Sequence, residues 1–328
     1  MTKTDILMPG PLLPSTMQAL DEAFLIHRLW EQPDRDAFFR DVGPRIRGIA
    51  TSTGSGPMNA ALFGRLPNLE VVSSFGVGYD NVDVAAAAER GIIVTNTPDV
   101  LNDEVADLTI GLLLATLRQI PQADRYLRAG HWLKAPLPLS ATLRARTVGI
   151  VGLGRIGKAI ARRLEGFDVA IAYHGRTKQD DVAYPFYATA TELAAACDVL
   201  IVITPGGAST KHLINADVLK ALGPNGVLIN VARGSVVDEQ ALIEALRSGT
   251  ILSAGLDVFQ DEPNVPQELI DMEHVVLLPH IASASVHTRK AMGQLVVDNL
   301  ISWFGGKGPL TPVPETPWAP TEPPATAG

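Results

Sequence analysis

The sequence predicts an α/β protein made of two domains, each built on an open parallel sheet. Short apolar segments alternate with amphipathic stretches along almost all of the 328 residues, as expected for parallel strands covered by helices. The length favours two domains, because one domain usually contains roughly 100–200 residues. Hydrophobic residues make up 46% of the chain and charged residues 19%, a composition that excludes wholesale disorder.

The first predicted sheet lies within the first hundred residues. Amphipathic stretches at residues 17–23 and 82–90 predict helices between its strands. Its five strands are expected at residues 5–8, 24–29, 46–50, 69–73 and 92–95.

The second predicted sheet begins at residue 147. Its strands are nearly continuous apolar segments, which is typical of strands buried on both faces. They are expected at residues 147–151, 169–173, 199–204, 227–230, 252–255 and 275–278. Helices over residues 103–118 and 285–304 flank this series, and the second would return the chain to the first domain. The Pro- and Gly-rich end beyond residue 304 predicts a polyproline-like arm or a loose tail.

Charge and composition exclude several classes of function. The chain has 27 Lys and Arg against 35 Asp and Glu, a net charge of −8, which argues against binding to nucleic acid or an anionic membrane. No apolar segment reaches the roughly 18 residues of a membrane span, and the N-terminus does not resemble a signal peptide. The one cysteine, Cys197, cannot form an internal disulfide, and no Cys/His spacing indicates a metal site. We therefore expect a soluble cytoplasmic protein without a metal.

The clearest local motif is a glycine-rich turn between a strand and a helix. The strand over residues 147–151 is followed by GLGRIG, with glycines at Gly152, Gly154 and Gly157. The first allows a tight turn, the second lets the backbone approach a pyrophosphate, and the third lets helix and strand pack closely. The N–H groups and dipole at the start of the helix favour phosphate there. This motif predicts a dinucleotide site.

The end of the next strand indicates which dinucleotide binds. An NAD-binding site places an Asp or Glu there to hold the ribose hydroxyls, but this strand ends in YHGRTK, residues 173–178. Without that carboxylate a 2′-phosphate is not repelled, and Arg176, Thr177 and Lys178 can donate hydrogen bonds to it. We expect NADP(H), with NAD(H) bound more weakly if at all. The alternative is a solvated basic turn.

Three ionisable residues follow successive predicted strands. Arg233 follows LINVA, Glu262 follows GLDVF, and His280 follows VVLLP. Ligands bind beyond the carboxyl ends of strands in an open α/β sheet. An imidazolium can protonate the alkoxide left by hydride transfer, and a neighbouring carboxylate orients and stabilises it. A guanidinium can hold the carboxylate and carbonyl of a 2-oxo acid.

A turn in the first domain offers a site for the substrate carboxylate. In SSFGVGYDNVD the small residues leave the N–H groups of Val77 and Gly78 exposed, and such a nest binds anions. A plain tight turn is the alternative.

Taken together, these motifs resemble the D-isomer-specific 2-hydroxyacid dehydrogenase family over about residues 5–313. The resemblance is carried by SFGVGYDNVD, NTPDVLNDEVADLTIGLLL, VGIVGLGRIGKAIA, LINVARGSVVDEQAL, AGLDVFQDEP and LLPHIAS. It implies two Rossmann-like or flavodoxin-like domains with an active-site cleft between them. The implied substrate-binding domain comprises residues 1–100 and 288–328, and the NADP-binding domain residues 101–287.

The resemblance also implies site residues and an assembly. Arg233, Glu262 and His280 form the implied catalytic set, and substrate contacts fall on Val77, Gly78, Arg233 and His280. A homodimer is implied through the cofactor domain and residues 101–146, with Trp132 either reaching the partner's active site or packing in the dimer core. The implied cofactor contacts are Gly152, Gly154, Arg155, Ile156, Gly157, Gly175, Arg176, Thr177, Thr204, Pro205, Val231, Ala232, Arg233 and Asp257.

Within the family, the chain is similar to NADPH-dependent glyoxylate/hydroxypyruvate reductases and plant-type hydroxyphenylpyruvate reductases. The segments SSFGVG, TNTPDVL, YHGRTK and EPNVPQELIDMEHVVLLPH carry this narrower match. Small 2-oxo acids are thus the expected substrates, with phenylpyruvate or hydroxyphenylpyruvate as the alternative. A different class of function is a non-catalytic dinucleotide sensor resembling corepressors of the same fold. The chain departs from the family pattern at two places. These are Gly175, where a serine is often found, and the extension beyond Pro314.

Overall fold

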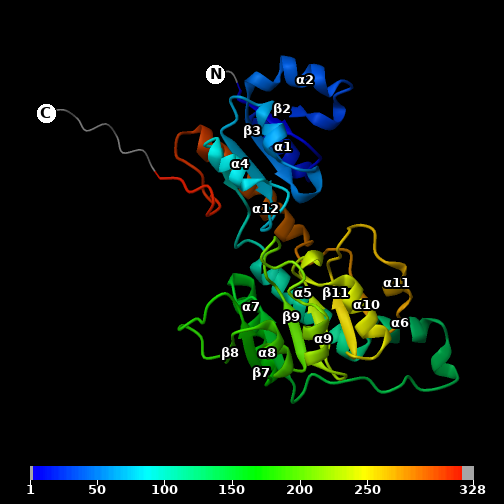
Figure 1. The fold of residues 1–328 in the computed structure, drawn as a ribbon. Helices are drawn as coiled ribbons and strands as arrows, with labels where there is room; N and C mark the ends of the chain where they lie inside the picture. Colours follow the sequence, from blue (N-terminus) through cyan, green and yellow to red (C-terminus); the bar gives the residue numbers. More distant parts are fainter. Residues whose placement is uncertain (1–2, 320–328) are drawn as a thin grey trace. The chain divides into compact units, whose positions relative to one another are not determined.

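The computed structural model describes residues 3–319, which belong to two compact units (Figure 1). Of the described residues, unit 1 comprises 3–100 and 285–319, and unit 2 comprises 101–284. The chain re-enters unit 1 at Ser285, which caps the long helix α12 (Val286–Phe304) by accepting a hydrogen bond from the N–H of Thr288. This division lies three residues before the boundary expected from the sequence.

Unit 1 is built on a five-stranded parallel sheet with strand order β2-β1-β3-β4-β5. This is the flavodoxin-like order, in which the chain reverses direction across the sheet between β1 and β3. Every strand predicted here is present, within two residues of its expected ends. The strands are β1 (Asp5–Met8), β2 (Leu25–Arg28), β3 (Ile46–Ser52), β4 (Val71–Phe75) and β5 (Ile93–Thr95).

Helix α12 joins unit 1 although it lies almost 200 residues beyond β5 in the chain. It packs on α1 and β4, and Gly293 permits the contact with α1, since a Cβ there would lie 1.9 Å from Oγ1 of Thr16. The hydroxyl of Ser73 on β4 donates to the carbonyl of Val296 at 3.1 Å. The other helices of the unit are α1 (Pro14–Ala23), α2 (Arg35–Asp41), α3 (Ala60–Gly64) and α4 (Val84–Glu89).

Unit 2 is built on a seven-stranded parallel sheet with strand order β12-β11-β10-β9-β6-β7-β8. This is the Rossmann order, extended by one strand, and its switch point lies between β6 and β9. The six predicted strands are all present, and only the short edge strand β8 was not foreseen. The strands are β6 (Thr147–Val151), β7 (Ala170–His174), β8 (Phe186–Tyr187), β9 (Val199–Val202), β10 (Val227–Asn230), β11 (Ser253–Leu256) and β12 (Val276–Leu277).

Apolar clusters cover both faces of this sheet. Along β9, Leu200 and Val202 face one cluster and Val199 and Ile201 face the other, as the two-residue period of a strand requires. Helices α8 (Ala190–Ala195), α9 (Ala216–Leu222) and α10 (Glu239–Arg247) supply the first cluster. Helices α5 (Asn102–Arg118) and α7 (Arg155–Leu164) supply the second. The remaining helices of the unit are α6 (Ile120–Arg128) and α11 (Gln267–Asp271).

The Pro-rich end of the chain is more ordered than the sequence suggested. Pro312 forms an antiparallel bridge with Thr95 of β5, and Val313 and Thr316 are buried. This segment therefore extends the edge of the unit 1 sheet, while residues 320–328 lie outside the described part of the chain. Within residues 3–319, no helix is both long and apolar enough to cross a membrane.

Candidate active site

Arg233, Glu262 and His280 lie beyond the carboxyl ends of three neighbouring strands of unit 2. Arg233 follows β10, Glu262 follows β11, and His280 follows β12, and these strands are adjacent in the sheet. Parallel strands bring their carboxyl ends to one edge, so residues about 50 positions apart in sequence share that edge.

His280 and Glu262 form a hydrogen-bonded imidazole–carboxylate pair. Nδ1 of His280 lies 2.7 Å from Oε2 of Glu262, and Oε1 accepts the N–H of Phe259 at 3.1 Å. Burial acts to raise the pKa of Glu262, but the hydrogen bonds from His280 and Phe259 and the charges of His280 and Arg233 together lower it. The glutamate is therefore ionised at neutral pH and favours a proton on Nδ1. This arrangement leaves Nε2 to exchange a proton with a substrate.

The backbone of His280 is held in a strained conformation by Asp257. His280 has a φ of 53°, in the left-handed region that costs a non-glycine residue about 1–3 kcal/mol. Its N–H donates to the carbonyl of Asp257, and the buried carboxylate of Asp257 accepts the N–H groups of Ile281 and Ala282 at 2.7 and 2.9 Å. Burial raises the pKa of this carboxyl against the lowering effect of the two N–H groups. Asp257 thus fixes the direction of the imidazole.

Asn230 and Gly234 shape the turn that carries Arg233. The buried Asn230 accepts the N–H of Ala232 at 3.1 Å and donates to the carbonyl of Arg233 at 3.2 Å. A Cβ on Gly234 would lie 1.9 Å from the carbonyl carbon of Phe259, so only glycine allows this turn to contact the segment before Glu262. Sequence reasoning did not identify either residue, although a buried amide at the end of an apolar strand was a visible signal.

The glycine-rich turn after β6 has the geometry that a dinucleotide requires. Gly152 has a φ of 102°, and a Cβ on Gly157 would lie 2.2 Å from the carbonyl oxygen of Gly152. Gly154 is exposed, has no atom within 4 Å of its Cβ position, and caps the ten-residue helix α7, at whose start Arg155 and Ile156 lie. The open N-terminus of this helix is suited to a pyrophosphate.

Further predicted cofactor contacts lie along the same edge of the sheet. Thr204 follows β9, and its buried hydroxyl has no hydrogen-bond partner among residues 3–319. Pro205 beside it is exposed, whereas Val231 and Ala232 after β10 are buried. An unpartnered buried hydroxyl between the phosphate turn and the His280–Glu262 pair fits a ligand that extends from one to the other.

The basic turn after β7 is exposed and cationic. Arg176, Thr177 and Lys178 make no hydrogen bond or ion pair within the described part of the chain, and Gly175 leads into the turn. The nearby carboxylate of Asp181 is paired with Lys158 at 2.6 Å, a hydrogen bond that lowers the pKa of Asp181. The turn can therefore receive an anionic group without competition from this carboxylate.

The predicted carboxylate nest lies in unit 1, in the turn after β4. Val77 and Gly78 are half-buried there. Thr97 fixes the start of the turn by two hydrogen bonds to Gly76. The N–H of Thr97 donates to the carbonyl of Gly76, and the hydroxyl of Thr97 accepts the N–H of Gly76. The amide of Asn96 donates to the carbonyl of Val77 at 2.8 Å.

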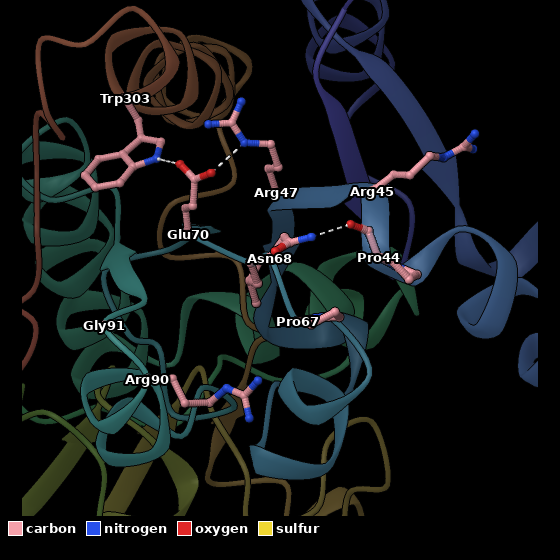
Figure 2. A pocket seen from close by; sticks show the side chains of 10 residues that line it. Pro44, Arg45, Arg47, Pro67, Asn68, Glu70, Arg90, Gly91 and Trp303 are labelled. Atoms are coloured by element: carbon pink, nitrogen blue, oxygen red, sulfur yellow. Dashed lines mark hydrogen bonds and ion pairs between the residues drawn. The ribbon is translucent and has the colours of Figure 1, made fainter.

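A hollow of about 590 Å³ opens at the opposite edge of the same sheet (Figure 2). It is lined by residues that precede β3, β4 and β5, by Arg47 within β3 and by Trp303 of α12. Figure 2 shows Glu70 between Arg47 and Trp303. Nε of Arg47 donates to Oε1 of Glu70 at 2.5 Å, and Nε1 of Trp303 donates to Oε2 at 3.0 Å. The carboxylate is already neutralised and no acid–base pair is present, so we do not place the active site here.

Trp132, the residue predicted to contact either a partner's active site or the dimer core, is 67% exposed. It lies on a 3₁₀ turn (His131–Leu133) in the segment that extends from α6 along the side of unit 2 (Figure 1). Within residues 3–319, no group of three or more His, Cys, Asp or Glu side chains is arranged to hold a metal ion.

The Rossmann sheet carries a phosphate turn, and the same edge of the sheet carries an imidazole–carboxylate pair and an arginine. Together these features define a dinucleotide-dependent oxidoreductase. The profile described as D-isomer specific 2-hydroxyacid dehydrogenase, NAD binding domain, matches residues 110–282. The chain belongs to the D-isomer-specific 2-hydroxyacid dehydrogenase family.

Individual relatives match along nearly the whole chain. The chain is 46% identical to a glyoxylate/hydroxypyruvate reductase A of Arabidopsis thaliana, covering 95% of this chain and 100% of the relative. It is 47% identical to a hydroxyphenylpyruvate reductase of Plectranthus scutellarioides, covering 94% and 98%. The crystal structure of an NADPH-dependent glyoxylate/hydroxypyruvate reductase of Sinorhizobium meliloti with NADP and malonate is 55% identical, covers 97% and 98%, and superimposes with a TM-score of 0.92.

Proposed function

We propose that this protein uses NADPH to reduce small 2-oxo acids, glyoxylate and hydroxypyruvate, to D-2-hydroxy acids. The observation that carries the proposal is the hydrogen bond between His280 and Glu262, at the sheet edge that also carries Arg233 and a phosphate turn. The relatives of similar sequence, two of them named glyoxylate/hydroxypyruvate reductases, support the choice of substrate.

The chemistry supplied by bound NADPH is hydride transfer to the carbonyl carbon of the substrate. Arg233 polarises the carbonyl and holds the substrate carboxylate, to which the N–H groups of Val77 and Gly78 also donate. Protonated His280 donates its Nε2 proton to the carbonyl oxygen as negative charge develops there, which completes the alcohol. Glu262 stabilises the imidazolium before the transfer and keeps Nδ1 protonated afterwards.

The cofactor is held along one edge of the unit 2 sheet. The start of α7 would hold the pyrophosphate, and the hydroxyl of Thr204 and the backbone at Val231 and Ala232 would hold the part of the cofactor that extends towards His280. Arg176 and Thr177 hold the 2′-phosphate of NADPH, because no carboxylate at the end of β7 repels it.

The exposed segment between α6 and β6 supports a homodimer. Leu133 and Leu139 are almost wholly exposed in the single chain, as is much of Trp132, and clustered exposed apolar side chains indicate a protein interface. We propose that a second copy covers them and that the protein acts in the cytoplasm. Light scattering of the wild type and of Leu133→Glu tests the dimer, and a wild-type monomer contradicts it.

Initial rates of NADPH and NADH oxidation with glyoxylate, hydroxypyruvate and phenylpyruvate test the proposed activity. Rapid turnover of the two small acids with NADPH is the expected result. Preference for phenylpyruvate would favour the second candidate, a hydroxyphenylpyruvate reductase, which the Plectranthus scutellarioides relative supports. Tight NADPH binding without turnover of any acid would instead indicate a dinucleotide sensor.

A further inference from the structure

The carboxylate nest consists of the N–H groups of Val77 and Gly78. Thr97 and Asn96 control the directions of these two groups. A planar trans peptide places its C=O and the following N–H on opposite sides, so fixing one fixes the other. The carbonyl of Gly76 accepts the N–H of Thr97 at 2.8 Å, which sets the direction of the N–H of Val77. The carbonyl of Val77 accepts the side-chain amide of Asn96 at 2.8 Å, which sets the direction of the N–H of Gly78.

Asn96 is itself held by the end of the chain. The hydroxyl of Thr311 donates to the carbonyl of Asn96 at 2.6 Å, and the N–H of Asn96 donates to the carbonyl of Thr311 at 3.3 Å. Asn299 of α12, which is fully buried, donates to the hydroxyl of Thr311 at 2.9 Å and accepts the N–H of Thr311 at 3.1 Å. A continuous set of hydrogen bonds thus leads from α12 to the nest.

A second contact joins the end of the chain to the same turn. The hydroxyl of Tyr79, one residue beyond Gly78, donates to the carboxylate of Glu315 at 3.1 Å. Burial, and after it the hydrogen bond to Glu315, raise the pKa of Tyr79 to about 12, so the hydroxyl stays a donor throughout the neutral range.

The segment that provides these contacts, residues 310–316, is firmly anchored. The N–H of Val313 donates to the carbonyl of Val94, and the hydroxyl of Thr316 accepts the N–H of Val94 at 2.9 Å. Both side chains are buried, 1% and 3% exposed. The segment therefore behaves as part of the sheet edge and not as a free tail.

We propose that residues 310–316 are a positioning element for the substrate carboxylate, with Asn96 as the positioning residue through which they act on Val77 and Gly78. The proposal rests on the proposed function, in which the N–H groups of Val77 and Gly78 bind that carboxylate. It explains why this segment, which contains two prolines, is docked against the sheet. It also predicts that the affinity for 2-oxo acids depends on side chains that do not touch the substrate.

Asn96→Ala tests this role directly. Losing one hydrogen bond to the Val77 carbonyl is worth about 0.5–1.5 kcal/mol, so we expect KM for glyoxylate to rise on the order of 3- to 10-fold. We expect kcat to change less than twofold and the Kd of NADPH to stay constant, since neither depends on the nest. Thr311→Val should raise KM in the same direction, and Thr311→Ser, which keeps the hydroxyl, should restore it.

Asn68→Ala is the matched control. Asn68 also donates its amide to a backbone carbonyl of unit 1, that of Pro44 at 2.7 Å, but at the opposite edge of the sheet (Figure 2). If the wild type is active and Asn96→Ala has the same KM for glyoxylate as Asn68→Ala, the positioning role is overturned but the proposed function is not. A wild type inactive on every 2-oxo acid would overturn the proposed function and this inference together.

Discussion

Nδ1 of His280 lies 2.7 Å from the carboxylate of Glu262, and the carboxylate of Asp257 binds the two backbone N–H groups that follow His280. One carboxylate therefore orients the imidazole ring and another orients the backbone that carries it. Because the left-handed backbone of His280 is unfavourable by itself, this double anchoring indicates a position built for a defined direction of proton transfer.

Replacing His280, the proposed proton donor, should remove catalysis without weakening cofactor binding. In His280→Gln the alkoxide has no acid to protonate it, so kcat for glyoxylate should fall on the order of 10²–10⁴-fold. The phosphate turn is untouched, so the Kd of NADPH, measured by its fluorescence, should remain within twofold. A variant with near-normal kcat would contradict the role assigned to His280.

Glu262→Gln should alter both activity and the pH dependence of stability. The lowered pKa of Glu262 means that its ionised form stabilises the folded protein above the ordinary glutamate pKa and that this contribution is lost as pH falls through the lowered value. The wild type should therefore unfold at higher urea concentration than the variant at pH 7, and this difference should shrink as the pH is lowered through that range.

The size of that stability difference is limited because the side chain of Glu262 is 35% exposed, so we expect about 1 kcal/mol or less. The effect on kcat should be larger, on the order of 10²-fold, since the imidazolium loses its counter-charge and orientation. Glu244→Gln, which removes a carboxylate from an exposed i,i+3 pair with Arg247, is a suitable control and should change neither quantity. Equal effects of the two substitutions would contradict the ion pair's role.

The sheets and the positions of Arg233, Glu262 and His280 at one sheet edge could be predicted from sequence because both depend on local patterns. Strands such as β6 and β10 are apolar throughout and begin and end where expected. Arg233 and His280 follow such strands directly, and parallel strands gather their ends at one edge. The assembly and the individual cofactor contacts follow only from the family resemblance and stay predictions.

The parts that sequence reasoning did not predict depend on contacts between distant segments. β8 consists only of Phe186 and Tyr187 and exists because it pairs with β7. The proline content of the chain end suggested a loose arm, whereas Val313 and Thr316 dock on a strand more than 200 residues earlier. No spacing in the sequence indicates that Gly234 contacts Phe259.

Gly234→Ala should displace the turn that carries Arg233. The new Cβ would lie 1.9 Å from the Phe259 carbonyl, so the backbone must move, at a cost of about 1–3 kcal/mol in the free energy of unfolding. We expect kcat/KM to fall at least tenfold as Arg233 leaves its position, measured beside a urea titration. Gly166→Ala, where no atom lies within 4 Å of the Cβ position, should be tolerated. A Gly234→Ala protein as stable and active as Gly166→Ala would contradict the close contact.

Arg176→Ala should weaken the preference for NADPH over NADH. If Arg176 binds the 2′-phosphate, its loss removes a hydrogen bond to a charged group worth about 1.5–3 kcal/mol, which predicts a 10- to 150-fold rise in KM for NADPH. KM for NADH, which has no such phosphate, should stay within twofold, and kcat with saturating NADPH should be unchanged.

Lys158→Ala tests the charge of the neighbouring loop, because it frees the carboxylate of Asp181 to repel the phosphate. That variant should raise KM for NADPH less than Arg176→Ala does. Equal effects of Arg176→Ala on both cofactors would show that the basic turn is only a solvated surface loop.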